Sequence, residues 1–490
     1  MSRLRVLALL MAVLLPSFMT ALDNTVVNVA LPQIRAELAL SDAELKWVAA
    51  VYPLALASLL LLGGHLSDTV GRRATLSLGV ALFTVASAGC GAASSGMTLV
   101  ACRGLQGAGA ALILPASLAV LSHDLPPRAR TAAFSATTAV LASALACGPV
   151  VSGVMTQHLG WESVFAMNTP LGCASLLACF LVPRAGPAAR AASKPSAGLS
   201  LRAVALACCA LAALAHCLIE GPEQGVGGTV ALSGLVVAAS AVGLSYELRS
   251  PRNTVLRLLF RQRPFIGGII TQLLWGLSVS GVYFFTSQFL QNGLGLSPTA
   301  AGLSFIPVAF SLIVTTPFIA RMARRWGDGR ISAAGLLLVG LGLLLAALGS
   351  SGGNLVHILP GLSAIGFGSA LAVPLTTRAL ESPPDHLSGI AAGLFSAVRE
   401  ASGVVGIALV GVMVSFVQQA AIAAGADDSG AFLSGYQAGL CLAGALVGAG
   451  APVALWALRD RHPNGRGELP GRPRHHSGTK HTEPHAPNRS

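Results

Sequence analysis

The sequence has 490 residues, of which 53% are hydrophobic and only 10% are charged. A soluble domain usually carries about a quarter charged residues, so this composition is that of a membrane protein. The formal net charge is +12, but the basic residues are scattered singly and in pairs between apolar runs, without the basic stripe that nucleic-acid binding requires. None of the lysines follows a glycine, which excludes the phosphate-binding loop of the common ATP-hydrolysing proteins.

The amino terminus carries Arg3 and Arg5 ahead of an apolar run, as a signal peptide would. The run continues to Ala30, long enough to cross a bilayer, and lacks a small-x-small cleavage site, so we expect an uncleaved first helix. Apolar runs of spanning length predict fourteen transmembrane helices, near residues 4–30, 47–65, 74–93, 99–122, 131–155, 163–182, 201–219, 226–246, 265–290, 299–320, 331–348, 355–377, 389–417 and 434–458.

Basic residues are distributed unevenly between the predicted loops. With a cytoplasmic amino terminus, the cytoplasmic segments hold 27 of the 31 Lys and Arg residues. The outer loops hold Arg35 and Lys46, and Arg103 and Arg399 lie within spans. Acidic residues show no comparable bias, as the positive-inside rule expects. We therefore predict an all-α, polytopic protein of the cell (inner) membrane, a monomer in the lipid bilayer with both termini in the cytoplasm.

The two halves of the sequence resemble each other weakly at an offset of 256 to 259 residues. Parallel six-helix repeats around a central cavity are a transporter architecture. Chance alignment stays open in a chain with 56 glycines, although the matches fall in corresponding spans. The matched pairs are Gly71 with Gly327, Gly107 with Gly366, Gly109 with Gly368, Pro115 with Pro374, Gly148 with Gly406 and Gly153 with Gly411.

The repeat and the span count together predict four parts. Residues 1–183 form an amino-terminal six-helix bundle, and residues 264–458 form a carboxy-terminal six-helix bundle. Residues 184–263 form a linker that contains two extra transmembrane helices. The tail at 459–490 is rich in Pro, Gly, His and Arg without apolar periodicity, so we expect a disordered cytoplasmic segment.

The loop after the second span combines a tight turn with a carboxylate and paired guanidinium groups. Its defining residues are Gly64, Asp68, Gly71, Arg72 and Arg73. Such a cluster can hold one helix end against a neighbour, and breaking it would release a rocking motion. An ordinary positive loop would explain the arginines but not the Gly-x-x-x-Asp-x-x-Gly-Arg-Arg spacing. The pattern resembles the cytoplasmic signature of the major facilitator superfamily.

Three further segments resemble motifs of that superfamily and of its fourteen-span drug:proton antiporters. Residues 22–32 resemble the first-helix motif of these antiporters, and residues 103–107 resemble the fourth-helix motif of the superfamily. Gly148 and Pro149, followed by Gly153, resemble the fifth-helix antiporter motif. The Gly-Pro pair removes a side chain and a backbone donor, which either kinks a helix or permits close packing. The resemblance covers residues 1 to about 458 and implies two six-helix bundles, two inserted helices and proton-coupled export by alternating access.

The sequence departs from the family pattern at several positions. Ala144 and Ser152 stand where the fifth-helix motif usually has glycine, and Trp161-Glu162 stands where a Trp-Arg-Trp-like string is common. Some relatives carry an acidic residue in the tenth span that matters for cationic drugs, and residues 299–320 contain none. That absence puts dicationic substrates in doubt.

Asp23 is the main candidate for proton coupling. An ionised Asp inside a span costs roughly 2.5–3.5 kcal/mol on insertion scales, so Asp23 should face the bundle interior, where protonation becomes accessible near neutral pH. Arg103 lies early in the inward-running fourth span and Asp23 late in the outward-running first, so their depths should match. A guanidinium beside Asp23 would stabilise the carboxylate, and its loss would allow protonation. An Asp capping a broken helix and an Arg snorkelling to the outer interface are the alternatives.

Five polar residues are candidates for the wall of a substrate cavity: Asn24, Asn28, Gln106, Arg399 and Glu400. Arg399 and Glu400 are neighbouring opposite charges near the middle of the thirteenth predicted span. Adjacent residues point about 100° apart on a helix, so these two need not pair. Arg399 is a candidate contact for an anionic or polar substrate group, although we expect a structural partner on another helix first.

These observations predict a secondary transporter that exchanges protons for drugs, antibiotics or other small amphiphilic molecules, with no cofactor, metal or nucleic-acid partner. One proton entering down 100 mV and one pH unit supplies roughly 3.7 kcal/mol, which sustains a gradient of about 500-fold. A proton-linked metabolite importer is the alternative, because the Gly-Pro pair favours antiport by family analogy alone. A membrane enzyme would need a polar loop cluster, for which His123-Asp124 is a poor candidate. A sensor would usually carry a folded soluble domain.

Overall fold

Every regular element in the computed structural model is helical within the residues that it describes, which are 3–125, 127–181, 201–224, 228–249, 258–384 and 387–459. The principal helices are α1 (Arg3–Leu38), α2 (Asp42–Thr69), α3 (Arg72–Gly91), α4 (Gly96–Asp124), α5 (Pro127–Leu159), α6 (Glu162–Ala166), α7 (Asn168–Leu181), α9 (Leu201–Gln224), α10 (Gly228–Arg249), α12 (Arg263–Gln288), the π-helix η2 (Phe289–Gly293), α13 (Pro298–Leu303), α14 (Ile306–Trp326), α15 (Asp328–Ser350), α16 (Leu355–Glu381), α17 (Ser388–Ala423), α18 (Asp428–Gly448) and α19 (Gly450–Ala457).

Twelve segments of the described chain are long and apolar enough to cross a membrane. They are α1 to α5, α6 with α7, α12 with η2, α13 with α14, α15, α16, α17, and α18 with α19. The helices α9 and α10 occupy the positions expected for the inserted pair. Their described apolar portions, Cys209–Glu220 and Ser233–Gly243, are shorter than a bilayer span, so the number fourteen stays a prediction.

The internal repeat is present in the way the helices pack. A Cβ added at Gly107 of α4 would lie 2.3 Å from the carbonyl oxygen of Tyr52 on α2. A Cβ added at Gly366 of α16 would lie 2.2 Å from the carbonyl oxygen of Val308 on α14. The contact between α4 and α2 in the first half is therefore equivalent to the contact between α16 and α14 in the second half. Chance matching of glycines would not produce this equivalence.

A second pair of glycines repeats this correspondence. Gly109 of α4 lies against the backbone of α3 at Phe83, and Gly368 of α16 lies against the backbone of α15 at Val339. Both α3 and α15 begin at a glycine whose φ angle is strongly positive, 109° at Gly71 and 87° at Gly327. An L-residue with a side chain rarely adopts this conformation, so both turns require glycine.

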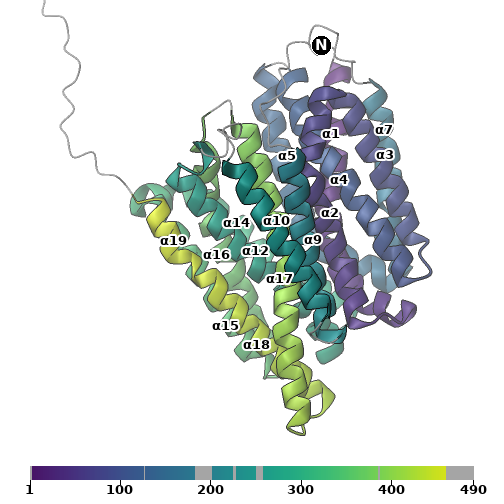
Figure 1. The fold of residues 1–490 in the computed structure, drawn as a ribbon, viewed down its shortest axis with the longest axis vertical. Coiled ribbons are helices and arrows are strands. Elements are labelled where there is room, and N and C mark those ends of the chain that lie inside the picture. Colours follow the sequence, from purple (N-terminus) through teal and green to yellow (C-terminus); the bar gives the residue numbers. More distant parts are fainter. Residues whose placement is uncertain are drawn as a thin grey trace, which may run out of the picture. The chain divides into compact units, whose positions relative to one another are not determined.

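Two contacts, each between a helix of one half and a helix of the other, join the halves at the end of the bundle where α1 ends. On one side, α5 packs on α13, where a Cβ at Gly153 would lie 2.3 Å from the carbonyl oxygen of Pro298. On the other side, α17 packs on α2, where a Cβ at Gly411 would lie 3.3 Å from Cε of the buried Lys46. Figure 1 shows the helices of the first half in purple to blue and those of the second half in teal to yellow.

Helix α9 covers the seam between the two halves, because it packs on both α2 and α17. The indole N–H of Trp47 on α2 donates to Oε1 of Glu220 on α9 at 2.7 Å. The Trp47 ring centroid lies 6.3 Å from that of His216 on the same helix. An apolar cluster completes the contact and joins the three helices; its buried members are Ala43, Ala50, Leu54, Ala215, Ile219, Val404 and Ala408.

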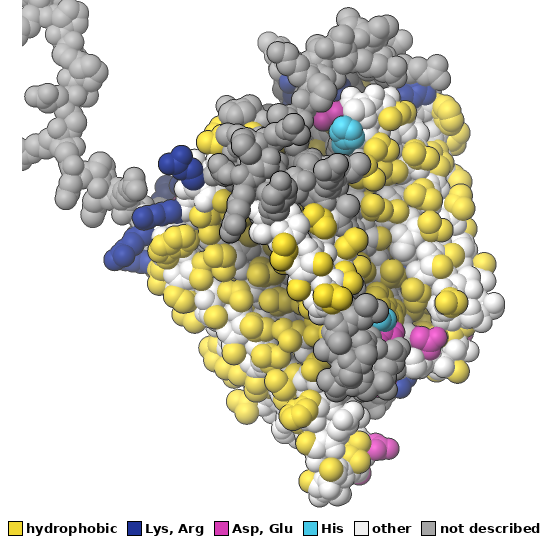
Figure 2. All heavy atoms as spheres, viewed as in Figure 1, with side chains coloured by type: hydrophobic (Ala, Val, Ile, Leu, Met, Phe, Trp, Pro, Cys, Tyr) yellow, Lys and Arg dark blue, Asp and Glu magenta, His cyan; other side chains and the backbone are white. Residues whose placement is uncertain are grey.

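Apolar side chains dominate the face shown in Figure 2, and the charged side chains lie toward its margins. This is the distribution expected where helices contact lipid. Residues Met1–Leu458 form one compact unit, which includes both halves. The linker residues 184–200 and the tail residues 460–490 lie outside the described part of the chain.

The glycine contacts can be tested by a matched pair of alanine substitutions. Gly366→Ala would place a methyl group against the backbone of α14, whereas a Cβ at Gly448 on α18 meets nothing within 4 Å. We expect Gly366→Ala to cost roughly 1–3 kcal/mol of stability through overpacking, and Gly448→Ala to cost nothing or to stabilise slightly. Thermal unfolding of the purified protein in detergent measures both. Equal melting temperatures for the two variants would contradict the close packing of α16 on α14.

Candidate proton-coupling site and central cavity

Asp23 on α1 is fully buried within the first half. Its carboxylate forms an ion pair with the guanidinium of Arg103 on α4. Oδ1 also accepts hydrogen bonds from Nε2 of Gln106 at 2.8 Å and from Nδ2 of Asn168 on α7 at 3.1 Å. Three donors directed at one carboxylate offset the cost of burying its charge.

Arg103 is as deeply buried as its partner, with 2% of its side chain exposed. Its Nε donates to the carbonyl oxygen of Val48 at 3.3 Å, and the guanidinium carbon lies 4.5 Å from the ring centroid of Tyr52. A side chain held this way does not reach the membrane interface, so the snorkelling alternative is wrong. The match in depth between Asp23 and Arg103 follows from α1 and α4 running in opposite directions.

Gln106 was predicted to line a substrate cavity, and that prediction is wrong. The side chain is fully buried; it donates to Asp23 and to Oγ of Ser87 on α3 at 2.7 Å, and it accepts from Nη1 of Arg103 at 2.9 Å. The reason is helical periodicity. Residues three apart lie on the same face of α4, so Gln106 follows Arg103 into the protein interior.

Asn168 was not identified from the sequence. It begins α7 directly after the break that separates this helix from α6, in an otherwise apolar segment. The signal that could have identified it is a polar amide in an apolar segment, because polar groups inside membrane helices are usually bonded to one another. Its Nδ2 donates to Asp23, while its Oδ1 is buried without a hydrogen-bond partner among the described residues. The amide therefore has an unused acceptor beside the carboxylate.

A cavity of about 360 Å³ lies between the two halves. Four of the five residues predicted for its wall do line it: Asn24, Asn28, Arg399 and Glu400. The wall combines aromatic rings from Trp275 and Tyr283 with hydroxyl groups. The lining hydroxyl residues, besides Tyr283, are Ser17, Thr20, Thr25, Ser117, Thr137, Ser280 and Ser396. Such a mixture of apolar surface and a few polar groups is typical of sites for small amphiphilic molecules.

Arg399 and Glu400 pair with each other although they are adjacent on α17. Nε and Nη2 of Arg399 donate to Oε1 of Glu400 at 3.0 and 2.8 Å. The expectation of a partner for Arg399 on another helix is therefore wrong, because the long arginine side chain folds back over its neighbour. The contact to another helix belongs to Glu400, whose Oε2 accepts from Nδ2 of Asn24 at 3.2 Å. This bond joins the second half to the first across the cavity.

The residues of the fifth-helix motif lie at helix contacts. A Cβ at Gly148 would lie 2.0 Å from Oγ1 of Thr25, so α5 approaches α1 more closely than a side chain would allow. The carbonyl oxygen of Pro149 lies 2.2 Å from a Cβ added at Gly302 on α13. Ser152, which replaces a usual glycine, donates its hydroxyl to the carbonyl oxygen of Val26. The motif therefore permits close packing of α5 on α1 and α13.

The cluster after the second span lies at the opposite end from the contacts between α5 and α13. Nη2 of Arg73 donates to the carbonyl oxygen of Phe180 near the end of α7 at 3.0 Å, and its guanidinium lies 6.0 Å from the Phe180 ring centroid. Asp68 is exposed, and Gly64 has no close steric contact. Arg73 thus fastens α3 to α7 within the first half.

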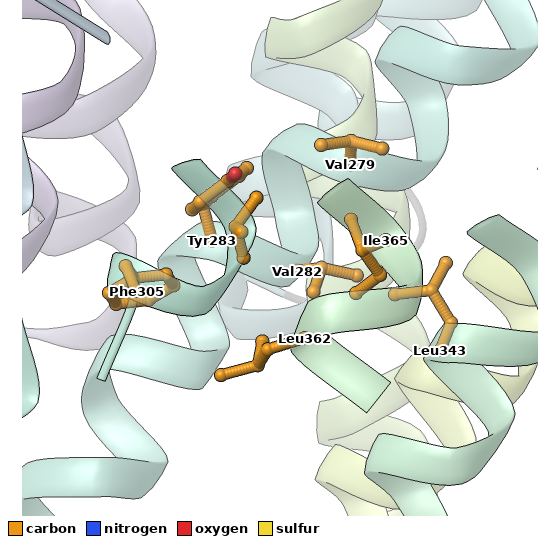
Figure 3. Close-up of a pocket in the computed structure, with 8 residues that line it drawn as sticks. Val279, Val282, Tyr283, Phe305, Leu343, Leu362 and Ile365 are labelled. Atoms are coloured by element: carbon orange, nitrogen blue, oxygen red, sulfur yellow. The ribbon is translucent and has the colours of Figure 1, made fainter. Parts of the chain in front are cut away.

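A small apolar pocket lies beside the cavity in the second half (Figure 3). Tyr283 and Phe305 lie on one side of it with ring centroids 5.3 Å apart, and Leu343 lies on the other. Its volume is about 10 Å³, which accommodates at most one water. Tyr283 belongs to both walls, so this small pocket adjoins the cavity.

Comparisons with known proteins agree with this geometry. Residues 13–407 match the Major Facilitator Superfamily. The chain is 33% identical over 415 residues to the tetracenomycin C resistance and export protein of Streptomyces glaucescens, covering 83% of this chain and 75% of that protein. It is 32% identical over 419 residues to the multidrug resistance protein Stp of Mycobacterium tuberculosis strain H37Rv, covering 84% and 76%. The fold resembles that of the POT family transporter PepTSo, with a TM-score of 0.68 at 15% identity over 93% of this chain and 99% of that one.

The hydrogen bond from Asn168 to Asp23 can be tested by Asn168→Leu, which keeps the approximate size of the side chain and removes its donor. Loss of this donor leaves the buried Asp23 carboxylate with one hydrogen bond fewer, at a cost of about 1–3 kcal/mol. We expect transport by this variant to fall about tenfold, measured in proteoliposomes. The control is Asn354→Leu, which removes an exposed helix cap at the start of α16. Undiminished transport by Asn168→Leu would contradict a role for this bond.

Proposed function

The chain belongs to the Major Facilitator Superfamily, and we propose that it is a proton-coupled antiporter that exports antibiotics, drugs or other small amphiphilic molecules. The observation that carries the proposal is the position of Asp23. A buried carboxylate with three donors lies one residue before Asn24, which lines the central cavity. Protonation at one position of α1 can therefore alter the cavity wall at the next.

The named relatives support export rather than uptake. The two similar proteins are named for resistance and export of tetracenomycin C and for multidrug resistance. A chain that shares about a third of its residues with each, over more than four fifths of its length, is expected to share their direction of transport. The superfamily and these relatives point to transport, without a catalytic reaction.

We place both termini in the cytoplasm and count α9 and α10 as two further spans, giving fourteen. The charge bias between loops supports this orientation. With the amino terminus inside, the contacts between α5 and α13 lie toward the outside. Residues from the late part of α4 and the early part of α5 then line the cytoplasmic side of the cavity. The arrangement corresponds to an inward-facing state, from which an exporter would take up its substrate.

The proton step follows from the hydrogen-bond network. When Asp23 is ionised, it holds Arg103, Gln106 and Asn168. When Asp23 takes a proton, Arg103 loses its counter-charge, and the Asn168 amide can turn so that its unused Oδ1 accepts the new O–H. The three helices that meet at this carboxylate, α1, α4 and α7, then exchange one set of bonds for another. We assign proton coupling to Asp23 and Arg103 on this basis.

The remaining motif residues have structural roles in the proposed cycle. Gly148, Pro149 and Gly153 allow α5 to pack on α1 and α13, which are contacts that an outward-facing state must break. The cluster of Gly64, Asp68, Gly71, Arg72 and Arg73 is proposed to fasten the cytoplasmic ends of the helices. The protein is proposed to act as a monomer in the cell membrane, as two six-helix bundles with an inserted helix pair.

Asp23→Asn tests the proton assignment directly. The amide mimics the protonated acid permanently, so substrate can still bind while a pH gradient no longer drives uphill export. In vesicles we expect at least a tenfold loss of proton-driven accumulation with some downhill exchange retained. Asp23→Glu should keep partial activity with a shifted pH optimum, because the carboxyl group remains but its distance to Arg103 changes.

The matched control is Asp428→Asn, which neutralises an exposed carboxylate at the start of α18 and should leave export unchanged. Full pH-driven export by Asp23→Asn would remove Asp23 from the mechanism. Glu400 would then be the next carboxylate to examine, since it is the other acidic residue that is buried among the described side chains.

A further inference from the structure

The accessible charge of the central cavity is positive. Half of the Arg399 side chain is exposed, whereas only 6% of the Glu400 side chain is exposed. Both carboxylate oxygens of Glu400 are already engaged, Oε1 by Arg399 and Oε2 by Asn24. A molecule that enters the cavity therefore meets the guanidinium first and the carboxylate only after other bonds are broken.

The guanidinium retains donors that face away from Glu400. Arginine has five N–H donors in a planar fork. Among the described residues, Arg399 bonds through Nε and Nη2, both to Oε1 of Glu400. The Nη1 side of the fork is therefore available to a ligand. A carboxylate or a similar planar acidic group is the partner that this edge binds most strongly.

The remaining wall of the cavity suits an apolar body rather than a second charge. Apart from Arg399 and Glu400, none of the described residues that line the cavity is charged. Trp275 and Tyr283 offer ring surfaces, and the lining hydroxyl groups can bond to polar substituents. A volume of about 360 Å³ accommodates a molecule with two or three fused rings.

We propose that this cavity selects amphiphilic anions, in which an apolar, ring-containing body carries a carboxylate or comparable acidic group that binds the Nη1 edge of Arg399. Glu400 and Asn24 hold the guanidinium in place. The inference rests on the proposed export function and names the substrate class of that site. A cationic substrate is disfavoured, because it would lie beside an exposed guanidinium and would have to displace Arg399 and Asn24 to reach the carboxylate.

The charge of the substrate determines how strongly export depends on the membrane potential. Exchange of one entering proton for one leaving neutral molecule moves a single charge, whereas exchange for a leaving monoanion moves two charges in the same electrical direction. Export of an anion should therefore depend twice as steeply on the membrane potential. This dependence can be read without knowing the natural substrate.

Three fluorescent probes with the same ring system separate the possibilities: anthracene carboxylate, anthracene carboxamide and aminomethylanthracene. Binding is measured by fluorescence anisotropy with the full-length protein in detergent at pH 7. We expect the carboxylate to bind at least tenfold more tightly than the amide, and the ammonium compound to bind most weakly. Tightest binding of the ammonium compound, or equal binding of all three, would overturn the proposal.

Two substitutions are expected to change the affinity for the carboxylate probe in opposite directions. Arg399→Gln should weaken binding of the carboxylate about tenfold or more and leave the amide nearly unchanged. Glu400→Gln should strengthen carboxylate binding, because the guanidinium loses its competing counter-charge while Asn24 keeps an oxygen to bond. A site built for cations would show the reverse order. Arg324→Gln, an exposed arginine near the end of α14, is the matched control and should change nothing.

The experiment also distinguishes failure of the substrate class from failure of the export function. Proteoliposomes are energised with a pH gradient and, separately, with a potassium diffusion potential, and the carboxylate and amide probes are followed. Proton-driven export of the amide with no preference for the carboxylate would overturn the substrate class alone. Selective binding of the carboxylate without proton-driven movement of either probe would overturn the export function and leave the anion site standing.

Discussion

The burial of the ion pair between Asp23 and Arg103 sets constraints on much of the first half. Moving two charges out of water costs several kcal/mol per ion, and their attraction offsets that cost only when the remaining polar atoms are also bonded. Arg103 is accordingly bonded to the backbone of α2 and packed on Tyr52, while Gln106 extends the network to α3. Removing either charge would leave the other buried without a counter-charge, so the pair fixes the relative depth of α1 and α4.

Helix α1 connects this buried network to the cavity because neighbouring residues on a helix point about 100° apart. Asp23 faces the interior of the first half, and Asn24 faces the second half and bonds to Glu400. Thr25 lies against Gly148 of α5, so a movement of α1 would also displace α5, which packs on α13. Three successive residues of α1 thus contact the proposed proton site, the cavity wall and helix α5, with no intervening segment to absorb a movement.

The sequence predicted most of this arrangement where a strong physical signal existed. Twelve of the fourteen predicted spans are confirmed in the described residues and followed from hydropathy, and the partnership of Asp23 with Arg103 followed from matching depths in antiparallel helices. The polarity of Gln106 alone suggests a cavity wall, whereas its helical phase, three residues after Arg103, directs it into the protein interior. Asn168 was missed because only the tertiary fold brings the start of α7 beside α1. The pairing of Arg399 with Glu400 could not be read from helix geometry, since it depends on the side-chain conformation of Arg399.

The position of α9 bears on how the closed end can open. An outward-facing state must separate α2 from α17, and α9 packs on both. Toward α2 the apolar contacts are supplemented by directional ones: the Trp47 indole bonds to Glu220, and its ring lies beside His216. Toward α17 the described contacts are apolar and involve the small or branched side chains of Val404 and Ala408. Apolar surfaces slide past one another at lower cost than directional bonds break inside a membrane, where a freed polar group has no water to replace its partner. We therefore expect α9 to separate from α17 when the two halves move apart, and to stay bonded to α2.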